Sequence, residues 1–202
     1  MRLNRREAIG GLLATFTAPA IAAPAGLTSI ASTVDPLLAE RALAALFRHH
    51  GAIWSRDIIA IADFGLPSAA PRFFLIDILN GRTTSLLVTH GKGSDPDHSG
   101  MLQGFSDLVG SAATSEGAYL TGDAYQGVHG PSRRLIGLDP TNAHAEERAI
   151  VIHSAWYANP DMIVRQGKLG RSDGCFTFGE SDIALVLARL GRGRLLYAGR
   201  SV

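Results

Sequence analysis

The sequence predicts one mainly β domain with peripheral helices, an α+β arrangement in which a mixed sheet forms a sandwich or barrel. Three observations favour this fold class. Short apolar runs bounded by turn residues outnumber the helical patterns. Asn80-Gly81 stands between two such runs and is a strong short-range signal for a hairpin. The 23 glycines favour many tight turns, and a length of 202 residues suits one ordinary domain.

The first expected element is a helix. Asp35 is suited to cap its N-terminus, and Pro36 is suited to its first position. Leu38 and Leu46 fall on one side at helical spacing. Gly51 is expected to end the helix.

The remaining elements are mostly strands. Apolar runs predict strands at 57–63, 72–79, 83–89, 118–121, 148–153 and 194–198, and a helix at 182–190. The stretch 91–110 is rich in Gly, Ser and Asp and predicts a loop. The unbroken apolar run 149–152 predicts a buried strand.

The N-terminus predicts an export signal over residues 1–23. Arg5 and Arg6 precede a short apolar run, and Ala20-Ile21-Ala22 fits the rule for signal cleavage between small residues. The arginine pair suits a twin-arginine signal and an ordinary Sec signal equally well, and an uncleaved amphipathic anchor is the third alternative.

Residues 24–34 are rich in Ala, Pro, Ser and Thr and predict a linker, which leaves residues 35–202 as the single domain. The apolar run of the signal is too short to span a bilayer stably. We therefore expect an exported protein of the periplasm or cell envelope, without a membrane span in its mature form.

The composition excludes two classes of protein. Hydrophobic residues make up 46% of the chain and charged residues 18%, which is typical of a globular protein and not of a disordered one. The 19 basic and 18 acidic residues give a net charge of +1, so no face need carry the cations that track phosphates. We expect no nucleic-acid partner, and the oligomeric state stays open.

Cys175 is the only cysteine of the chain. Outside the cytoplasm disulfides are favoured, so an unpaired cysteine in an exported protein is a free thiol, an intermolecular bridge or a nucleophile. The alternative without a function is a buried, inert thiol that packs as a small hydrophobe.

The residues around Cys175 favour the nucleophile. Gly174 removes side-chain bulk beside the sulfur, and backbone N–H groups at 174–175 are suited to stabilise an oxyanion. Arg171 brings a positive charge that is expected to favour the thiolate. Ser172 offers a hydroxyl that can hold a neighbouring group in place.

His153 is the candidate base for this thiol. It ends the buried strand, 22 residues before Cys175, and a strand end fixes the orientation of an imidazole. A backbone carbonyl, for instance that of Ser154, can fix the tautomer in place of a carboxylate. The alternative is a histidine that is merely satisfied at a strand end.

The order His153-Ser154, seventeen residues, then Ser172-Asp173-Gly174-Cys175 resembles the signature of the YkuD-type L,D-transpeptidase catalytic domain. The chain is most similar to the murein L,D-transpeptidase catalytic-domain-like branch of that family. Supporting stretches follow in order from 58 to 198, at 72–77, 89–95, 118–122, 125–130, 134–139, 148–153 and 170–175.

The resemblance implies the mainly β fold of L,D-transpeptidases and a reaction on peptidoglycan stem peptides, without a cofactor. Cys175 is then the nucleophile that attacks a peptide bond between an L-centre and a D-residue, and His153 is the general base. Resolution of the acyl-enzyme by an amine gives L,D-transpeptidation, and resolution by water gives L,D-carboxypeptidase activity. Ser172 and Gly174 carry over as supporting positions of the cysteine motif.

Three departures from the family pattern bear on activity. Ser154 replaces a glycine, Asp173 places a carboxylate beside the thiol, and Phe176 follows the cysteine. A carboxylate at this position opposes thiolate formation unless it points away or pairs with Arg171. A catalytically impaired peptidoglycan-binding relative is therefore the alternative function.

Other residues support further roles. Tyr119 and His129 are expected to line the substrate groove, with Arg171 as a third substrate-binding residue. A metal-dependent hydrolase is a less favoured function, in which a zinc ion is bound by His90, His129, His153 and Asp123. No HExxH-type spacing supports that set, so no metal is expected. A thiol-redox role normally needs a resolving cysteine, and the chain has none.

Overall fold

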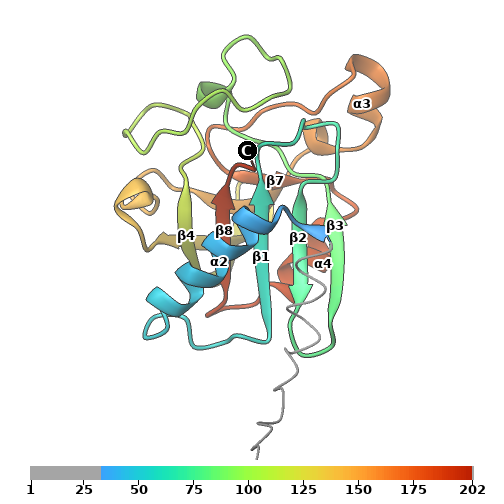
Figure 1. Cartoon of the computed structure of the whole chain (residues 1–202). Helices are drawn as coiled ribbons and strands as arrows, with labels where there is room; N and C mark the ends of the chain where they lie inside the picture. The colour runs from blue at the N-terminus through green and yellow to red at the C-terminus, as the bar shows by residue number, and fades with distance from the viewer. Residues whose placement is uncertain (1–32, 202) are drawn as a thin grey trace, which may run out of the picture.

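The computed structural model describes residues 33–201, which form an eight-stranded mixed sheet with few helices (Figure 1). The strand order is β3-β2-β1-β8-β4-β5-β6-β7. The strands are β1 Ile58–Asp63, β2 Phe73–Asp77, β3 Arg82–Leu86, β4 Gly117–Gly127, β5 Gly130–Gly137, β6 Val151–Ser154, β7 Phe176–Phe178 and β8 Leu195–Gly199. The α-helices are α2 Pro36–Arg48, α3 Asp161–Gln166 and α4 Ile183–Arg189, and short 3₁₀ turns occupy η1 Lys92–Ser94, η2 Pro140–Asn142 and η3 Trp156–Ala158.

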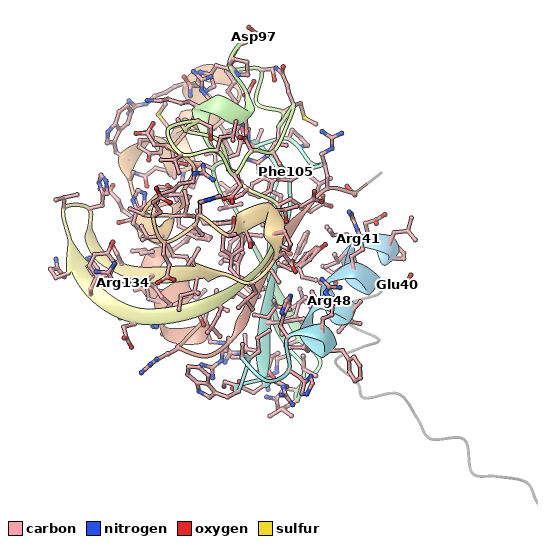
Figure 2. The ribbon with its side chains drawn as sticks, turned by 90° about the vertical axis from the view of Figure 1, so that its left-hand side faces the viewer. Glu40, Arg41, Arg48, Asp97, Phe105 and Arg134 are labelled. Carbon is pink, nitrogen blue, oxygen red and sulfur yellow. The ribbon has the colours of Figure 1, made fainter. Side chains whose placement is uncertain are left out.

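The sheet is mixed because two of its neighbouring pairs are parallel. β1 runs parallel to β8, and β6 runs parallel to β7, whereas the other neighbours are antiparallel. The sheet curls, and Figure 2 shows the β4–β5 hairpin arching away from the side of the molecule that carries α2. The predicted mainly β fold with peripheral helices is therefore confirmed, as one curled sheet.

Both faces of the sheet are buried, each by its own hydrophobic cluster. α2 covers one face and lies across β4, β8 and β1 (Figure 1). Leu38, Ala42 and Ala45 of α2 are fully buried in this cluster. The other cluster includes Phe73, Phe176 and several more aromatic and aliphatic side chains from both halves of the sheet. Burial on both faces explains why β1, β2 and β8 read as continuous apolar runs.

The ends of α2 agree with the sequence at one terminus only. The Asp35 side chain accepts a hydrogen bond from the Leu38 N–H at 2.9 Å, and Pro36 is the first helical residue, as predicted. The helix ends at Arg48, before Gly51. His49 is the C-terminal cap, and its ring binds the Asp139 carboxylate at 2.8 Å.

The predicted hairpin at Asn80-Gly81 is confirmed as the β2–β3 turn, where Gly81 has a φ of 65°. A second hairpin, β4–β5, is longer than the strand expected at 118–121. Its outer half alternates between half-buried and exposed residues, so it carries no apolar pattern. The two-residue turn Val128-His129 joins its strands, because Gly127 pairs with Gly130.

The predicted export signal and most of the predicted linker lie outside the described residues. Val34, the last residue of the predicted linker, is 4% exposed and packs in the α2 cluster. Within residues 33–201, no helix is long and apolar enough to cross a membrane.

Candidate active site

The loop before β7 holds Cys175 by backbone contacts with a distant segment. The Ser172 N–H donates to the His90 carbonyl at 3.0 Å, and the Lys92 N–H donates to the Ser172 carbonyl at 2.8 Å. The Ser172 hydroxyl donates to the Cys175 carbonyl at 2.7 Å and accepts from the Gly174 N–H at 3.2 Å. Ser172 therefore connects the loop to the segment at η1, and its hydroxyl also connects Gly174 and Cys175 within the loop.

Gly174 is required at its position. Its φ of +114° lies in the region that favours glycine, and a Cβ placed there would lie 2.6 Å from the carbonyl oxygen of Ala113. The same Cβ would lie 2.9 Å from Ile150 Cδ1 and 3.2 Å from Arg148 Nη2. The loop thus packs directly on the chain that enters β6.

The Cys175 thiol is half-buried and unpaired. Its hydrogen-bond partner is the Ala149 carbonyl, with 3.7 Å between Sγ and the oxygen. Burial raises the pKa of the thiol, and the Asp173 carboxylate raises it further. The backbone N–H of Val151 and the Arg148 guanidinium lower it, but the net direction is upward.

His153 lies on β6, opposite Thr177 of β7 in a parallel register. Its Nδ1 lies 3.0 Å from the Ser154 carbonyl, so Nδ1 carries the proton and donates. Nε2 lies 3.1 Å from the Thr177 hydroxyl, which donates to it. Burial lowers the pKa of His153 and the His129 ring lowers it further, whereas the Ser154 carbonyl raises it.

His153 lies on β6, and Cys175 immediately precedes the neighbouring strand β7. Cys175 precedes Thr177, the register partner of His153, by two residues, and side chains two residues apart point to the same face of a strand. At rest the thiol donates to Ala149 and the imidazole accepts from Thr177, so neither group is bonded to the other.

His129 contacts His153 from the turn of the β4–β5 hairpin. The two rings stack with centroids 4.4 Å apart and an angle of 22° between their planes. His129 is exposed, whereas His153 is 2% exposed, so the hairpin turn covers the imidazole. The expectation that His129 lies at the site agrees with this position.

One charged residue does not act as the sequence predicted. Arg171 donates to the backbone carbonyls of Asp95 and Pro96, and the cation that acts on the thiol is Arg148. The Asp173 carboxylate pairs with Lys92 Nζ at 2.6 Å, and it raises the pKa of Cys175, as expected of a carboxylate that does not pair with Arg171.

Tyr119 does not line a groove. Its ring is fully buried and packs edge-on against Phe176, and its hydroxyl donates to the Ser115 carbonyl at 2.8 Å. The prediction is wrong because an aromatic residue on a strand buried on both faces belongs to the core.

Of the four alternative zinc ligands, only His129 and His153 are in contact. His90 lies between Arg72 and Asp95, at 2.8 Å and 3.2 Å, and Asp123 pairs with Arg192 at 3.2 Å. Among residues 33–201, no group of three or more His, Cys, Asp or Glu is placed to hold a metal ion.

Three site residues were missed by sequence reasoning. Arg148 is 3% exposed and pairs with Asp107 at 3.3 Å. Thr177 is fully buried beside His153. Burial raises the pKa of Tyr157, a hydrogen bond with Thr177 lowers it, and the nearby Cys175 and Asp173 raise it. The available signal for two of these residues was their place in the sequence. Thr177 lies two residues after the cysteine, and Tyr157 lies four residues after the histidine.

Comparison with known proteins gives the family. The family model described as the L,D-transpeptidase catalytic domain matches residues 31–198. No curated protein sequence matches the chain.

Similar solved structures include three L,D-transpeptidases. L,D-transpeptidase 3 from Mycobacterium tuberculosis, in complex with a faropenem-derived adduct, is 13% identical with a TM-score of 0.45, covering 71% of this chain and 60% of that one. An L,D-transpeptidase from Mycobacterium smegmatis is 13% identical with a TM-score of 0.43, covering 71% and 58%. One from Xylanimonas cellulosilytica is 12% identical with a TM-score of 0.42, covering 72% and 61%. The chain thus spans less than two thirds of the length of these chains. Through the family match over most of its length, the chain belongs to the L,D-transpeptidase catalytic domain family.

Proposed function

We propose that the protein is a cysteine-dependent acyltransferase of peptidoglycan stem peptides, acting as an L,D-transpeptidase or an L,D-carboxypeptidase. Cys175 is the nucleophile and His153 the general base. The observation that supports this proposal is the β6–β7 register, in which His153, with its tautomer fixed by Ser154, pairs with Thr177, two residues after the chain's only cysteine.

The reaction begins when the thiol displaces the Thr177 hydroxyl from Nε2 of His153 and passes its proton to that nitrogen during the attack of the sulfur. Nε2 can accept the proton because Nδ1 donates to Ser154. The sulfur attacks the carbonyl carbon on the L-side of the scissile bond. The oxyanion is stabilised by the backbone N–H of Cys175, since the Gly174 N–H donates to Ser172 in this structure.

Collapse of the oxyanion expels the amine of the D-residue, which takes the proton from Nε2, and leaves a thioester on Cys175. The imidazole then accepts a proton from the incoming amine or water as that molecule attacks the thioester. The released sulfur recovers this proton, so the protein returns to its starting state. An amine acceptor gives a cross-link, and water gives a shortened stem peptide.

We also propose that the protein works outside the cytoplasm, in the periplasm or cell envelope. The support is the basic, apolar and small-residue pattern of residues 1–23. Fractionation of cells that express the full chain would test it, with a variant lacking residues 1–23 as the control.

The test of the activity is intact mass after incubation with a carbapenem, whose lactam carbonyl mimics the acylating carbonyl. Wild type is expected to gain the mass of one carbapenem, and Cys175→Ala to gain none. His153→Asn is expected to lose acylation nearly completely, whereas His129→Asn, which changes the stacked ring above it, keeps measurable acylation. A folded, reduced wild type without an adduct contradicts the proposal.

Incubation with a disaccharide-tetrapeptide then separates the two reactions, because transfer gives a dimer and hydrolysis gives a tripeptide. The alternative function, a catalytically impaired peptidoglycan-binding relative, predicts no product. It also predicts that wild type and Cys175→Ala sediment equally with purified peptidoglycan.

A further inference from the structure

The Thr177 hydroxyl is the group in contact with Nε2 of His153, at 3.1 Å. Thr177 is fully buried, and its backbone lies opposite His153 in the parallel ladder. Its position is further fixed by its carbonyl, which accepts from the Thr89 N–H at 3.0 Å. The hydroxyl is therefore held in place by two neighbouring segments.

A hydroxyl at this position can serve both protonation states of the imidazole. It donates its proton to Nε2 while His153 is neutral, and its oxygen can accept from Nε2–H once His153 is protonated. A carbonyl group could only accept from protonated Nε2, and an ammonium group could only donate to unprotonated Nε2. Because His153 is 2% exposed, water is a poor substitute for this partner.

We propose that Thr177 is a positioning residue of the acyl-transfer site, whose hydroxyl holds the resting imidazole and stabilises the imidazolium that forms when the thiol gives up its proton. The inference rests on the proposed function, in which His153 is the base. Loss of the Thr177 hydroxyl is expected to destabilise protonated His153 more than neutral His153. The reason is that an unpaired N–H on a buried cation costs more free energy than an unpaired neutral nitrogen.

Other titratable groups lie close to His153 and Thr177, so a test must leave these residues unchanged. His129 stacks on the imidazole from the β4–β5 turn. Tyr157, which follows β6, lies near Thr177, and Thr177 lowers its pKa. Cys175 and Asp173 lie in the loop before β7, and their charges act on Tyr157.

The perturbation is Thr177→Val, which removes the hydroxyl at nearly constant shape, with Thr177→Ser as the rescue. Thr89→Val is the matched control, because Thr89 is also fully buried, its hydroxyl has no hydrogen-bond partner among residues 33–201, and valine keeps the backbone N–H that bonds to Thr177. The first readout is the rate of carbapenem acylation from pH 5 to 9. The second is the titration of the His153 imidazole by NMR, which needs no substrate.

Thr177→Val is expected to acylate at least about tenfold more slowly, since a lost hydrogen bond to a charged group costs about 1.5–3 kcal/mol. Its His153 pKa is expected to fall by about one unit, so the acid limb of the pH profile moves to lower pH. Thr177→Ser is expected to recover most of both properties, and Thr89→Val to match wild type in both.

An imidazole that titrates alike in Thr177→Val and wild type would overturn the inference, whether or not the protein acylates. Equal acylation rates and pH limbs in these two proteins would also overturn it, and would leave the proposed function standing. Absence of acylation in wild type would instead contradict the proposed function, and the NMR titration would still decide the role of Thr177.

Discussion

Replacement of Gly174 by alanine is expected to disable the nucleophile loop. The new Cβ would lie 2.6 Å from the Ala113 carbonyl oxygen and 2.9 Å from Ile150 Cδ1, so the loop must move away from the chain that enters β6. The φ of +114° adds strain of about 1–3 kcal/mol for a residue with a side chain. Strain and displacement together should cost about 3 kcal/mol or more.

The displacement reaches the thiol because Ser172 binds both Gly174 and Cys175. A shift of about 1 Å at a reacting atom costs on the order of 100-fold in rate. We therefore expect the acylation rate of Gly174→Ala to fall about 100-fold. The melting temperature should fall by about 6–12 °C, at about 2–4 °C per kcal/mol for a domain of this size.

Gly167→Ala is the matched control. Gly167 has a φ of +75° at the end of α3, and a Cβ there would meet no atom within 4 Å. This variant keeps the backbone strain without the collision, so it should lose about 1 kcal/mol and acylate at the wild-type rate. Acylation of Gly174→Ala within twofold of wild type, at a similar melting temperature, would refute the reasoning.

Three further predictions follow from the charges and hydrogen bonds of the site. Asp173→Asn removes a carboxylate that raises the pKa of Cys175, so the pH of half-maximal alkylation by iodoacetamide should fall, whereas Asp97→Asn on the neighbouring loop should leave it unchanged. Ser172→Ala leaves two backbone groups of the loop unpaired, so it should lower stability by about 1–3 kcal/mol in urea unfolding and slow acylation, and unchanged values in both assays would contradict this. Burial and Arg72 lower the pKa of His90 from 6.5 to about 4 in the folded protein. As the pH falls, His90 of the unfolded state therefore binds a proton before His90 of the folded state does. The free energy of unfolding should fall by about 3 kcal/mol between about pH 6.5 and about pH 4. His90→Gln should show a shallower decline over this range, and equal slopes would exclude His90 as its source.

The sequence predicted the elements whose burial is continuous and the site residues that share one motif. The runs at 57–63 and 194–198 became β1 and β8, because buried parallel strands need apolar side chains on both faces. The outer half of β4–β5 and the three-residue β7 carry no such pattern, so their pairing is set by tertiary contacts.

The same limit applies to the site. His153 and Ser154 are adjacent in sequence, and the hydrogen bond between their ring and carbonyl follows from that adjacency. Arg148 and Arg171 show the opposite case, because the arginine four residues from the cysteine faces Asp95, whereas the one 27 residues away acts on the thiol. Sequence distance is a poor guide once the chain has crossed between strands.

The pKa shifts of Cys175 and His153 favour the neutral form of both groups, which bears on how the thiol is activated in the proposed reaction. Burial raises the pKa of Cys175 and lowers the pKa of His153, so both shifts oppose a standing thiolate–imidazolium pair. The Asp173 carboxylate raises the pKa of Cys175 further, and the stacked His129 ring lowers the pKa of His153 further. In the proposed reaction the proton therefore moves while the sulfur attacks, as the negative charge passes to the substrate oxygen and Thr177 stabilises the imidazolium. Such a thiol should react slowly with iodoacetamide at neutral pH and quickly with an acyl donor that fits the site, because only the donor accepts the charge that this pocket disfavours on sulfur.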